Sequence, residues 1–274
     1  MTFGVNNATV TFGGVTALDD VTVDVPARTV VALVGGDGAG KTTLLRALVR
    51  EVALDSGEVR APDKPCLGFL PASSGSWASL TVAQNIDFAG GVYGLTGDAL
   101  DTRRSELLGA ADLTDAADRL ASQLSGGMRR KLGFCMAIVH QPDLLVLDEP
   151  STGVDPVSRI DLWRLIASAA AGGTAVIMST TYLDEAERAG QLHVLDAGHI
   201  LTEGTYQQVR DHFDGTVTRG TPSRPEWSWR RGHHRHEYWP DNDPPPTAEV
   251  VDPDLEDIVI ALSLARTTPA GTPT

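Results

Sequence analysis

The stretch that decides the fold lies near the start of the chain and reads Gly35-Gly36-Asp37-Gly38-Ala39-Gly40-Lys41-Thr42. It matches the pattern G-x-x-x-x-G-K-[ST]. The apolar run Val30–Val34 before it is typical of a strand buried on both faces, and residues 44–49 after it are apolar at helical spacing. A glycine-rich loop in this context predicts a phosphate-binding loop. The alternative is a glycine-rich turn that holds no ligand.

Each part of this loop has a physical role in holding a nucleotide. Glycines let backbone N–H groups surround phosphates without Cβ clashes, and the helix N-terminus that follows favours anions. We expect Lys41 to reach the β- and γ-phosphates of ATP and Thr42 to hold Mg²⁺ through its hydroxyl. The expected nucleotide contacts are Gly35, Gly36, Asp37, Gly38, Ala39, Gly40, Lys41, Thr42 and Thr43.

A second apolar strand, Leu144–Leu147, ends in the pair Asp148-Glu149. This position corresponds to the carboxyl edge of a parallel sheet, where α/β proteins bind ligands. Phosphoryl transfer needs a metal ion and a positioned, activated water. We expect Asp148 to hold Mg²⁺ and Glu149 to act as general base. Taken alone, such a pair is equally typical of a solvated turn.

Composition limits the partners of the chain. The formal net charge of -14 over 274 residues argues against a sequence-independent grip on nucleic-acid phosphates. The two cysteines, Cys66 and Cys135, are far apart and suggest neither a disulfide framework nor a metal knuckle. No apolar stretch approaches the roughly 20 residues that span a bilayer. We therefore expect a cytoplasmic protein that reaches the membrane only through another chain.

The pattern along the chain predicts an α/β fold with additions. Residues 9–12 and 21–25 read as half-buried strands of an antiparallel flap, and residues 175–178 read as another buried strand of a parallel core. Residues 79–140 are Ala- and Leu-rich and predict a helical insertion, with helices at 98–111 and 128–139. We predict a cassette over residues 1–210 and a small appendage over 211–274, partly β or irregular, which closes with a helix at 255–264.

Between the two nucleotide motifs, Leu124-Ser125-Gly126-Gly127-Met128 is followed by Arg129-Arg130-Lys131. This run resembles the signature motif of ATP-binding-cassette (ABC) ATPases, and the likeness covers about residues 9–201. The resemblance implies a P-loop NTPase fold with a RecA-like core, an N-terminal antiparallel β subdomain and an inserted helical subdomain. It also implies that Ser125, Gly126, Gly127 and Met128 meet the ATP held by an opposite cassette.

The residues after the signature predict how its helix packs. Leu132, Cys135, Met136 and Val139 lie at helical spacing, so we expect one face in the core and a free Ser-Gly-Gly N-terminus suited to an anion. The alternative is an ordinary amphipathic helix that begins with glycine.

Three further segments match the family. Phe12 resembles the aromatic residue that stacks on adenine, although an aromatic residue in a strand is more often part of the core. The run 151–156 resembles the D-loop at the dimer interface, which implies interface roles for Ser151, Gly153 and Asp155. Residues 253–258 are similar to the tail of cassettes that serve ABC-2-type exporters, including drug exporters.

Two positions depart from the family pattern. Ala72 stands where a Gln contacts the metal region, and Thr181 stands where a His holds the γ-phosphate. The loss of a preorganised donor to transition-state charge raises the barrier by on the order of 2.7–4 kcal/mol. We predict tight ATP binding, slow hydrolysis and a heterodimer with a different cassette. The sequence of residues 36–38 and 181–187 resembles that of the first cassette of tandem-cassette exporters related to the ribosome-associated ABC ATPases.

A run of histidine and arginine lies in the appendage, with His233, His234 and His236 among Arg230, Arg231 and Arg235. A metal site or a nucleic-acid patch is conceivable for such a run. Metal sites need ligands held by a rigid scaffold, and this run has no Cys or acidic ligand at defined spacing. We interpret it as a solvated or partner-facing segment.

The resemblance implies the ATPase subunit of an exporter, peripheral on the inner face of the cell membrane, with a separate membrane-spanning permease and a second cassette as partners. A soluble mechanical ATPase acting on ribosomes or DNA is a second hypothesis. A regulatory subunit that binds ATP without turning it over is a third, favoured by Ala72 and Thr181 and opposed by Glu149.

Overall fold

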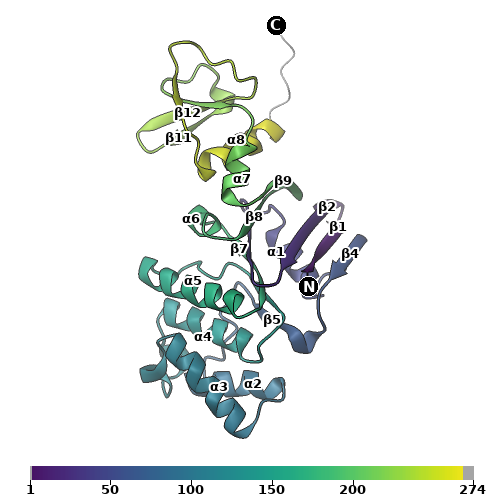
Figure 1. Cartoon of the computed structure of the whole chain (residues 1–274), viewed down its shortest axis with the longest axis vertical. Coiled ribbons are helices and arrows are strands. Elements are labelled where there is room, and N and C mark those ends of the chain that lie inside the picture. The colour runs from purple at the N-terminus through teal and green to yellow at the C-terminus, as the bar shows by residue number, and fades with distance from the viewer. Residues whose placement is uncertain (1, 268–274) are drawn as a thin grey trace.

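The computed structural model describes residues 2–267, and its centre is a six-stranded sheet in the order β5-β6-β7-β3-β8-β9 (Figure 1). Neighbouring strands are parallel except for the antiparallel pair β8–β9. Every residue of β3, β6 and β7 is buried, which explains the continuous apolar sequences of β3, β6 and the first four residues of β7. The strands are β3 Val30–Val34, β5 Leu67–Leu70, β6 Leu144–Leu147, β7 Ala175–Thr180, β8 Gln191–Asp196 and β9 His199–Gly204.

An antiparallel sheet in the order β2-β1-β4 flanks the core. Its strands are β1 Thr2–Phe12, β2 Val15–Pro26 and β4 Ser56–Arg60. Valines alternate between buried and exposed neighbours along β2, so that one face packs against helix α1 Lys41–Leu48 and the central strands. The predicted combination of an antiparallel flap and a parallel α/β core is confirmed.

The segment predicted to be a helical insertion contains α2 Val82–Val92, α3 Gly97–Ala110 and α4 Gly126–Ile138. The expected one-sided packing of α4 is wrong, because every residue from Arg130 to Ile138 is buried. This helix lies between α2 on one side and α5 Pro156–Ala171 and β5 on the other, so both of its faces meet protein. Two short helices, α6 Leu183–Ala186 and α7 Tyr206–Asp211, follow later in the chain. Single 3₁₀ turns lie at Lys64–Cys66, Thr114–Ala116, Ala121–Gln123 and Pro225–Trp227.

The residues after 211 form a four-stranded sheet in the order β11-β12-β10-β13, at the opposite end of the molecule from α2 and α3 (Figure 1). The strands are β10 Thr216–Arg219, β11 Ser228–Arg231, β12 His234–Trp239 and β13 Glu249–Val251. Helix α8 Leu255–Thr267 packs Leu255 and Ile258 against the cassette and Ala261 against the appendage sheet. Residues 268–274 of the predicted appendage lie outside the described residues.

The histidine run folds into the hairpin of β11 and β12. His233 and His234 are exposed, as the interpretation of a solvated segment requires. The interpretation is wrong for His236, which is buried and whose Nδ1 lies 2.8 Å from Asp257 Oδ1 on α8. His234 and His236 lie on the same face of β12, so their different exposure follows from their positions along the strand, with His236 lying against α8. Within residues 2–267, no group of three or more His, Cys, Asp or Glu is arranged to hold a metal.

Candidate functional site

The loop between β3 and α1 adopts a conformation that its glycines make possible. Gly38 has φ of 78° and Gly40 has φ of 108°, values that residues with a Cβ rarely adopt. A Cβ on Gly40 would lie 2.6 Å from the carbonyl oxygen of Ala17 on β2. No side chain caps α1, so the N–H groups of its first turn stay available. The loop therefore offers backbone donors at a helix N-terminus, which suits a phosphate group.

Lys41 is the strongest sign that this loop is built for an anion. Its side chain is 5% exposed, and its Nζ donates to the carbonyl oxygens of Gly35 at 2.7 Å and Gly36 at 2.9 Å. Burial lowers the pKa of this ammonium, and the nearby carboxylates of Glu149, Asp37 and Asp148 oppose that shift. Within residues 2–267, the hydrogen bonds of its ammonium go to these two carbonyl oxygens alone. A buried cation held only by neutral oxygens fits an anionic ligand.

The carboxyl ends of β6 and β7 bring the second half of the site to the same loop. Asp148, which is 2% exposed, accepts a hydrogen bond from Thr42 Oγ1 at 3.2 Å. The same carboxylate oxygen, Oδ1, accepts from Ser179 Oγ at 2.7 Å. A hydroxyl and a carboxylate in contact suit Mg²⁺, which binds proteins through one or two carboxylates and completes its shell with substrate phosphates and water. Thr42 and Asp148 therefore fit the metal that the sequence implied.

The signature segment and the D-loop segment lie together as a second group. A Cβ on Gly126 would lie 3.3 Å from the carbonyl oxygen of Gly153, and one on Gly127 would lie 2.5 Å from Ser158 Oγ on α5. Ser125 and Gly126 are exposed, but Gly127 is buried against α5, so the expectation of a free Ser-Gly-Gly end is wrong for Gly127. The Ser125 hydroxyl caps α4 by accepting from the Met128 N–H at 3.2 Å.

The three predicted D-loop interface positions differ in exposure. Gly153 and Asp155 are exposed, whereas Ser151 is buried within the chain. Asp155 caps α5, because its Oδ1 accepts from the N–H groups of Val157 and Ser158. Hydrogen bonds from Ser158, chiefly, lower the pKa of the Asp155 carboxyl. Asp155 thus combines a structural cap with an exposed position.

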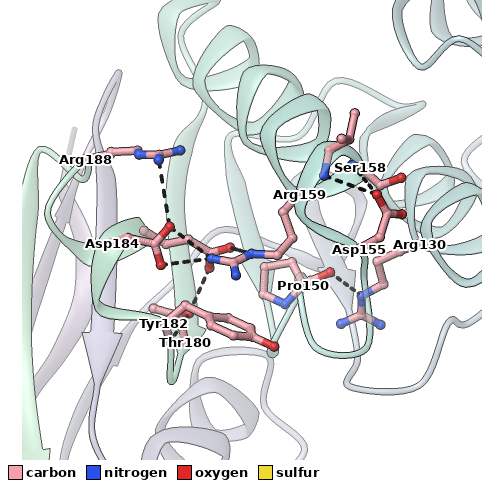
Figure 2. A network of polar contacts seen from close by, with 11 residues as sticks. Arg130, Pro150, Asp155, Ser158, Arg159, Thr180, Tyr182, Asp184 and Arg188 are labelled. Atoms are coloured by element: carbon pink, nitrogen blue, oxygen red, sulfur yellow. Dashed lines mark hydrogen bonds and ion pairs between the residues drawn. The ribbon is translucent and has the colours of Figure 1, made fainter. Parts of the chain in front are cut away.

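The turn that contains Thr181 is fixed on both sides by a polar network (Figure 2). Thr180 Oγ1 donates to Glu185 Oε2 at 2.8 Å and accepts from the Tyr182 N–H at 3.0 Å. Arg159 of α5 donates to Asp184 at 2.9 Å and to Glu185 at 3.2 Å, and its guanidinium lies 3.8 Å from the centre of the Tyr182 ring. Thr181 itself is exposed, two residues beyond Ser179. Thr181 therefore follows β7 directly, at the carboxyl edge of the sheet where β6 leads into Asp148.

The other two sequence-predicted positions are also exposed. Phe12 is 52% exposed at the end of β1, which excludes the alternative that it belongs to the core. Its hairpin continues into Ala17 and Leu18, which lie against Gly40 of the loop. Ala72 is exposed, and its carbonyl oxygen accepts from Arg130 Nη1 at 3.0 Å.

Two residues that connect the parts of the site were not predicted from the sequence. Ser179 bridges both acidic residues, and Arg130 contacts the backbone that carries them. A serine near the carboxyl end of a buried strand was a usable signal for the first. Arg130 had no such signal, because a basic residue in a helix is usually solvated.

Taken together, the fold and the site define a P-loop nucleotide-binding cassette with a signature segment and a C-terminal appendage. The ABC transporter family model matches residues 18–152. The chain is 39% identical over 185 residues to the "Probable multidrug ABC transporter ATP-binding protein YbhF" of Escherichia coli, which covers 64% of this chain and 32% of that protein. It is 33% identical over 211 residues to the "Nod factor export ATP-binding protein I" of Cupriavidus metallidurans, which covers 73% of this chain and 70% of that protein.

A solved structure described as an ATP binding subunit of an ABC transporter superimposes with a TM-score of 0.71 at 25% identity, over 78% of this chain and 93% of that chain. The chain belongs to the family of ABC transporter ATP-binding proteins. It spans about a third of the length of YbhF. None of the helices within residues 2–267 is long and apolar enough to cross a membrane.

Proposed function

We propose that this chain is the ATP-binding and hydrolysing subunit of an exporter, acting at the inner face of the cell membrane on a permease made by a separate polypeptide. The observation that carries the proposal is the buried, unpaired cation of Lys41 next to the contact of Thr42 with Asp148. The names of the relatives, a multidrug transporter protein and an export protein, support the direction of transport. The cassette corresponds to residues 1–210 and the appendage to 211–274.

The residues at the loop divide the chemistry of phosphoryl transfer among them. Lys41 and the N–H groups of residues 35–43 bind the phosphates, and Phe12 stacks on the base. Thr42 and Asp148 hold Mg²⁺, which supplies charge neutralisation at the triphosphate. Glu149 accepts the proton of the attacking water as general base. Each role is assigned from the chemical character of the side chain, which is cationic, hydroxyl-bearing or anionic, at this one edge of the sheet.

A second cassette is proposed to complete the site, and the exposed start of the signature, Ser125 and Gly126, is the surface that would meet it. Ser125, Gly126 and Met128 present the N-terminal end of α4, whose free dipole favours the phosphates of a facing nucleotide. Gly127 keeps α4 in contact with α5 and so holds the signature next to the exposed Gly153 and Asp155. The signature and the D-loop thus act as one rigid lid over the partner's ATP.

The permease is proposed to insert a short helix into an apolar groove of 230 Å³ between the segment after β5 and helix α2. Exposed large side chains border the groove, including Val92 at 68%, Phe88 at 49% and Trp77 at 45%. Trp77 and Phe88 pack edge to face with ring centroids 4.3 Å apart. Clustered exposed aromatic residues are typical of protein interfaces, and a helix face fits an apolar groove.

Hydrolysis at the chain's own loop is proposed to be slow, since Ala72 and Thr181 lack the amide and the imidazole of the family pattern. A threonine hydroxyl is shorter than imidazole and carries no charge near neutral pH. The chain would then work as the impaired half of a heterodimer, like the first cassette of a tandem-cassette exporter, with its signature serving a competent partner. The same two residues favour a second candidate, a regulatory subunit that binds ATP without turning it over.

Calorimetry and turnover together test the proposal. Titration of the full chain with Mg-ATP should give a binding heat that Lys41→Ala abolishes. Turnover should be slow for the chain alone and rise when the cassette encoded beside it is added. The expected neighbouring permease has about six apolar spans of roughly 20 residues. Rapid turnover by the lone chain would contradict the impaired heterodimer, whereas unchanged turnover after Glu149→Gln in the assembled complex would favour the regulatory candidate.

A further inference from the structure

The backbone of Glu149 is in an unfavourable conformation. Its φ is 46°, in the left-handed region that residues with a Cβ avoid. Such conformations are energetically unfavourable and persist only where the surroundings enforce them, often at functional sites. The residue lies two positions after the end of β6, and its charge near Lys41 opposes the lowering of the Lys41 pKa by burial. The question is which groups enforce this conformation.

Two side chains from other elements bind the backbone of Glu149. Its N–H donates to Ser179 Oγ on β7 at 2.8 Å, and its carbonyl oxygen accepts from Arg130 Nη2 on α4 at 2.8 Å. The N–H of Thr152 also donates to that carbonyl oxygen, at 3.2 Å, as part of the following turn. Both peptide groups next to the Cα of Glu149 are therefore held, which fixes φ and ψ together.

Arg130 holds two segments of backbone together through hydrogen bonds to their carbonyl oxygens. It is 5% exposed, and its guanidinium donates to six carbonyl oxygens and, within residues 2–267, to no carboxylate. The carbonyls come from two segments, Pro71 to Ser73 after β5 and Asp148 to Pro150 after β6. Figure 2 shows its contact with Pro150. Only the planar fork of arginine, with five N–H donors, can join so many acceptors.

Ser179 joins the two acidic residues of the site. Its hydroxyl accepts from the Glu149 N–H and donates to Asp148 Oδ1 at 2.7 Å, and the side chain is fully buried. The same Oδ1 accepts from Thr42 Oγ1. One hydroxyl thus sets both the orientation of the Asp148 carboxylate and the backbone of its neighbour.

We propose that Ser179 and Arg130 are positioning residues that hold Glu149 in its left-handed conformation, so that its carboxylate stays at the loop edge beside Lys41. The direction of a side chain follows its backbone dihedrals, so relaxation to negative φ would turn this carboxylate elsewhere. The inference deepens the proposed function and rests on it for its kinetic readout. Its thermal readout is independent of any nucleotide.

The kinetic test is single-turnover hydrolysis of ATP with the full chain in excess. We expect Ser179→Ala and Arg130→Lys to lower the rate constant about 10- to 100-fold. Arg130→Lys, at a residue that does not touch the Asp148 carboxylate, should change the affinity for Mg-ATP less than about threefold. Ser179→Thr, which keeps the hydroxyl, should restore most of the rate. Matched controls are Thr174→Val, which removes a hydroxyl bound to Pro142 near the start of β7, and Arg103→Lys, at an arginine that donates to the carbonyls of Ile138 and Val139.

The thermal test is a double-mutant cycle. Ser179→Ala should lower the Tm of the chain by about 3–8 °C, and by about half as much in a Glu149→Gly background, since glycine adopts positive φ without a clamp. Equal Tm losses in both backgrounds, with an unchanged rate constant, would overturn the inference. If wild type hydrolyses no faster than Glu149→Gln, the proposed hydrolysis fails instead, and the thermal cycle alone decides whether these residues position Glu149.

Discussion

Two polar clusters in this chain bury charged groups, and they treat those groups in opposite ways. In the appendage, the carboxylate of Asp257 lies 2.9 Å from Arg231 and 2.8 Å from His236, so this charge is matched by partners within the chain. At the cassette loop, Lys41 is just as deeply buried but is held by carbonyl oxygens alone. Similar residue types thus make a structural lock in one place and a binding site in the other.

The difference lies in which charges are left for a ligand. Arg231 contacts Asp254, Glu256 and Asp257, and its hydrogen bond to Asp254, above all, raises the pKa of the guanidinium. Its N–H donors are already bound to carboxylates of the fold. The donors of Lys41 and of the first turn of α1 can exchange their contacts for phosphate oxygens, because neutral carbonyls bind a cation more weakly than anions do. Unmatched charge therefore marks the functional cluster.

The largest expected effect is that of Lys41→Ala, which removes the unmatched charge. The affinity for Mg-ATP should fall about 100- to 1,000-fold, since a buried charge pair is lost on the ligand side. The melting temperature should change little or rise, because a buried cation without a countercharge is removed. Calorimetry and thermal unfolding measure the two quantities. If Lys41→Ala has a much lower melting temperature yet still binds Mg-ATP tightly, Lys41 stabilises the fold and does not bind the nucleotide.

A second change adds a donor to the cassette edge. Thr181→His should raise the rate of ATP hydrolysis about 10- to 100-fold, because an imidazole can reach transition-state charge that the shorter hydroxyl does not. Steady-state turnover of the assembled complex is the measurement. The gain should disappear when Glu149→Gln is introduced as well. If Thr181→His leaves turnover unchanged, the slow step lies outside this turn.

A third change weakens the matched cluster. Asp257→Asn should lower the free energy of unfolding of the appendage by about 2 kcal/mol, since hydrogen bonds between charged groups are lost in a buried place. Fluorescence of Trp227, Trp229 and Trp239 follows this transition. Mg-ATP affinity should stay within about twofold. The control is Asp252→Asn, at an exposed pair with Arg210, where no change is expected. A loss of nucleotide affinity in Asp257→Asn would show that the two clusters are coupled.

The smallest expected effect is the loss of stability of the appendage at low pH. Burial alone would raise the pKa of Glu237, but hydrogen bonds from Ser223 and Arg224 outweigh it and hold the pKa below 4.5. A carboxylate with a lowered folded-state pKa stabilises the fold above pH 4.5, and this stability is lost as the pH falls through the folded pKa. The appendage should therefore loosen on acidification below that value, and Glu237→Gln should flatten the profile of tryptophan fluorescence against pH. If the wild type and Glu237→Gln give identical pH profiles, Glu237 does not contribute to the acid sensitivity of the appendage.

The sequence was most informative where a local pattern suffices. The buried strands Val30–Val34 and Leu144–Leu147 coincide with β3 and β6, because strands covered on both faces carry unbroken apolar runs. The glycine-rich loop was recognisable since its backbone conformation depends on residues within the loop itself. Helix α4 was less predictable, because its apolar spacing does not reveal that a second layer covers the face bearing Arg130.

By itself, the sequence determined the α/β class, the phosphate-binding loop, the acidic pair and the departures at Ala72 and Thr181, all of which are properties of contiguous residues. Only the tertiary structure decided that Ser179 and Arg130 enclose Glu149, that Gly127 packs on Ser158 and that His236 is locked to Asp257. These contacts join residues that are 19 to 31 positions apart. Packing of separate elements creates them, so no local periodicity carries their signal.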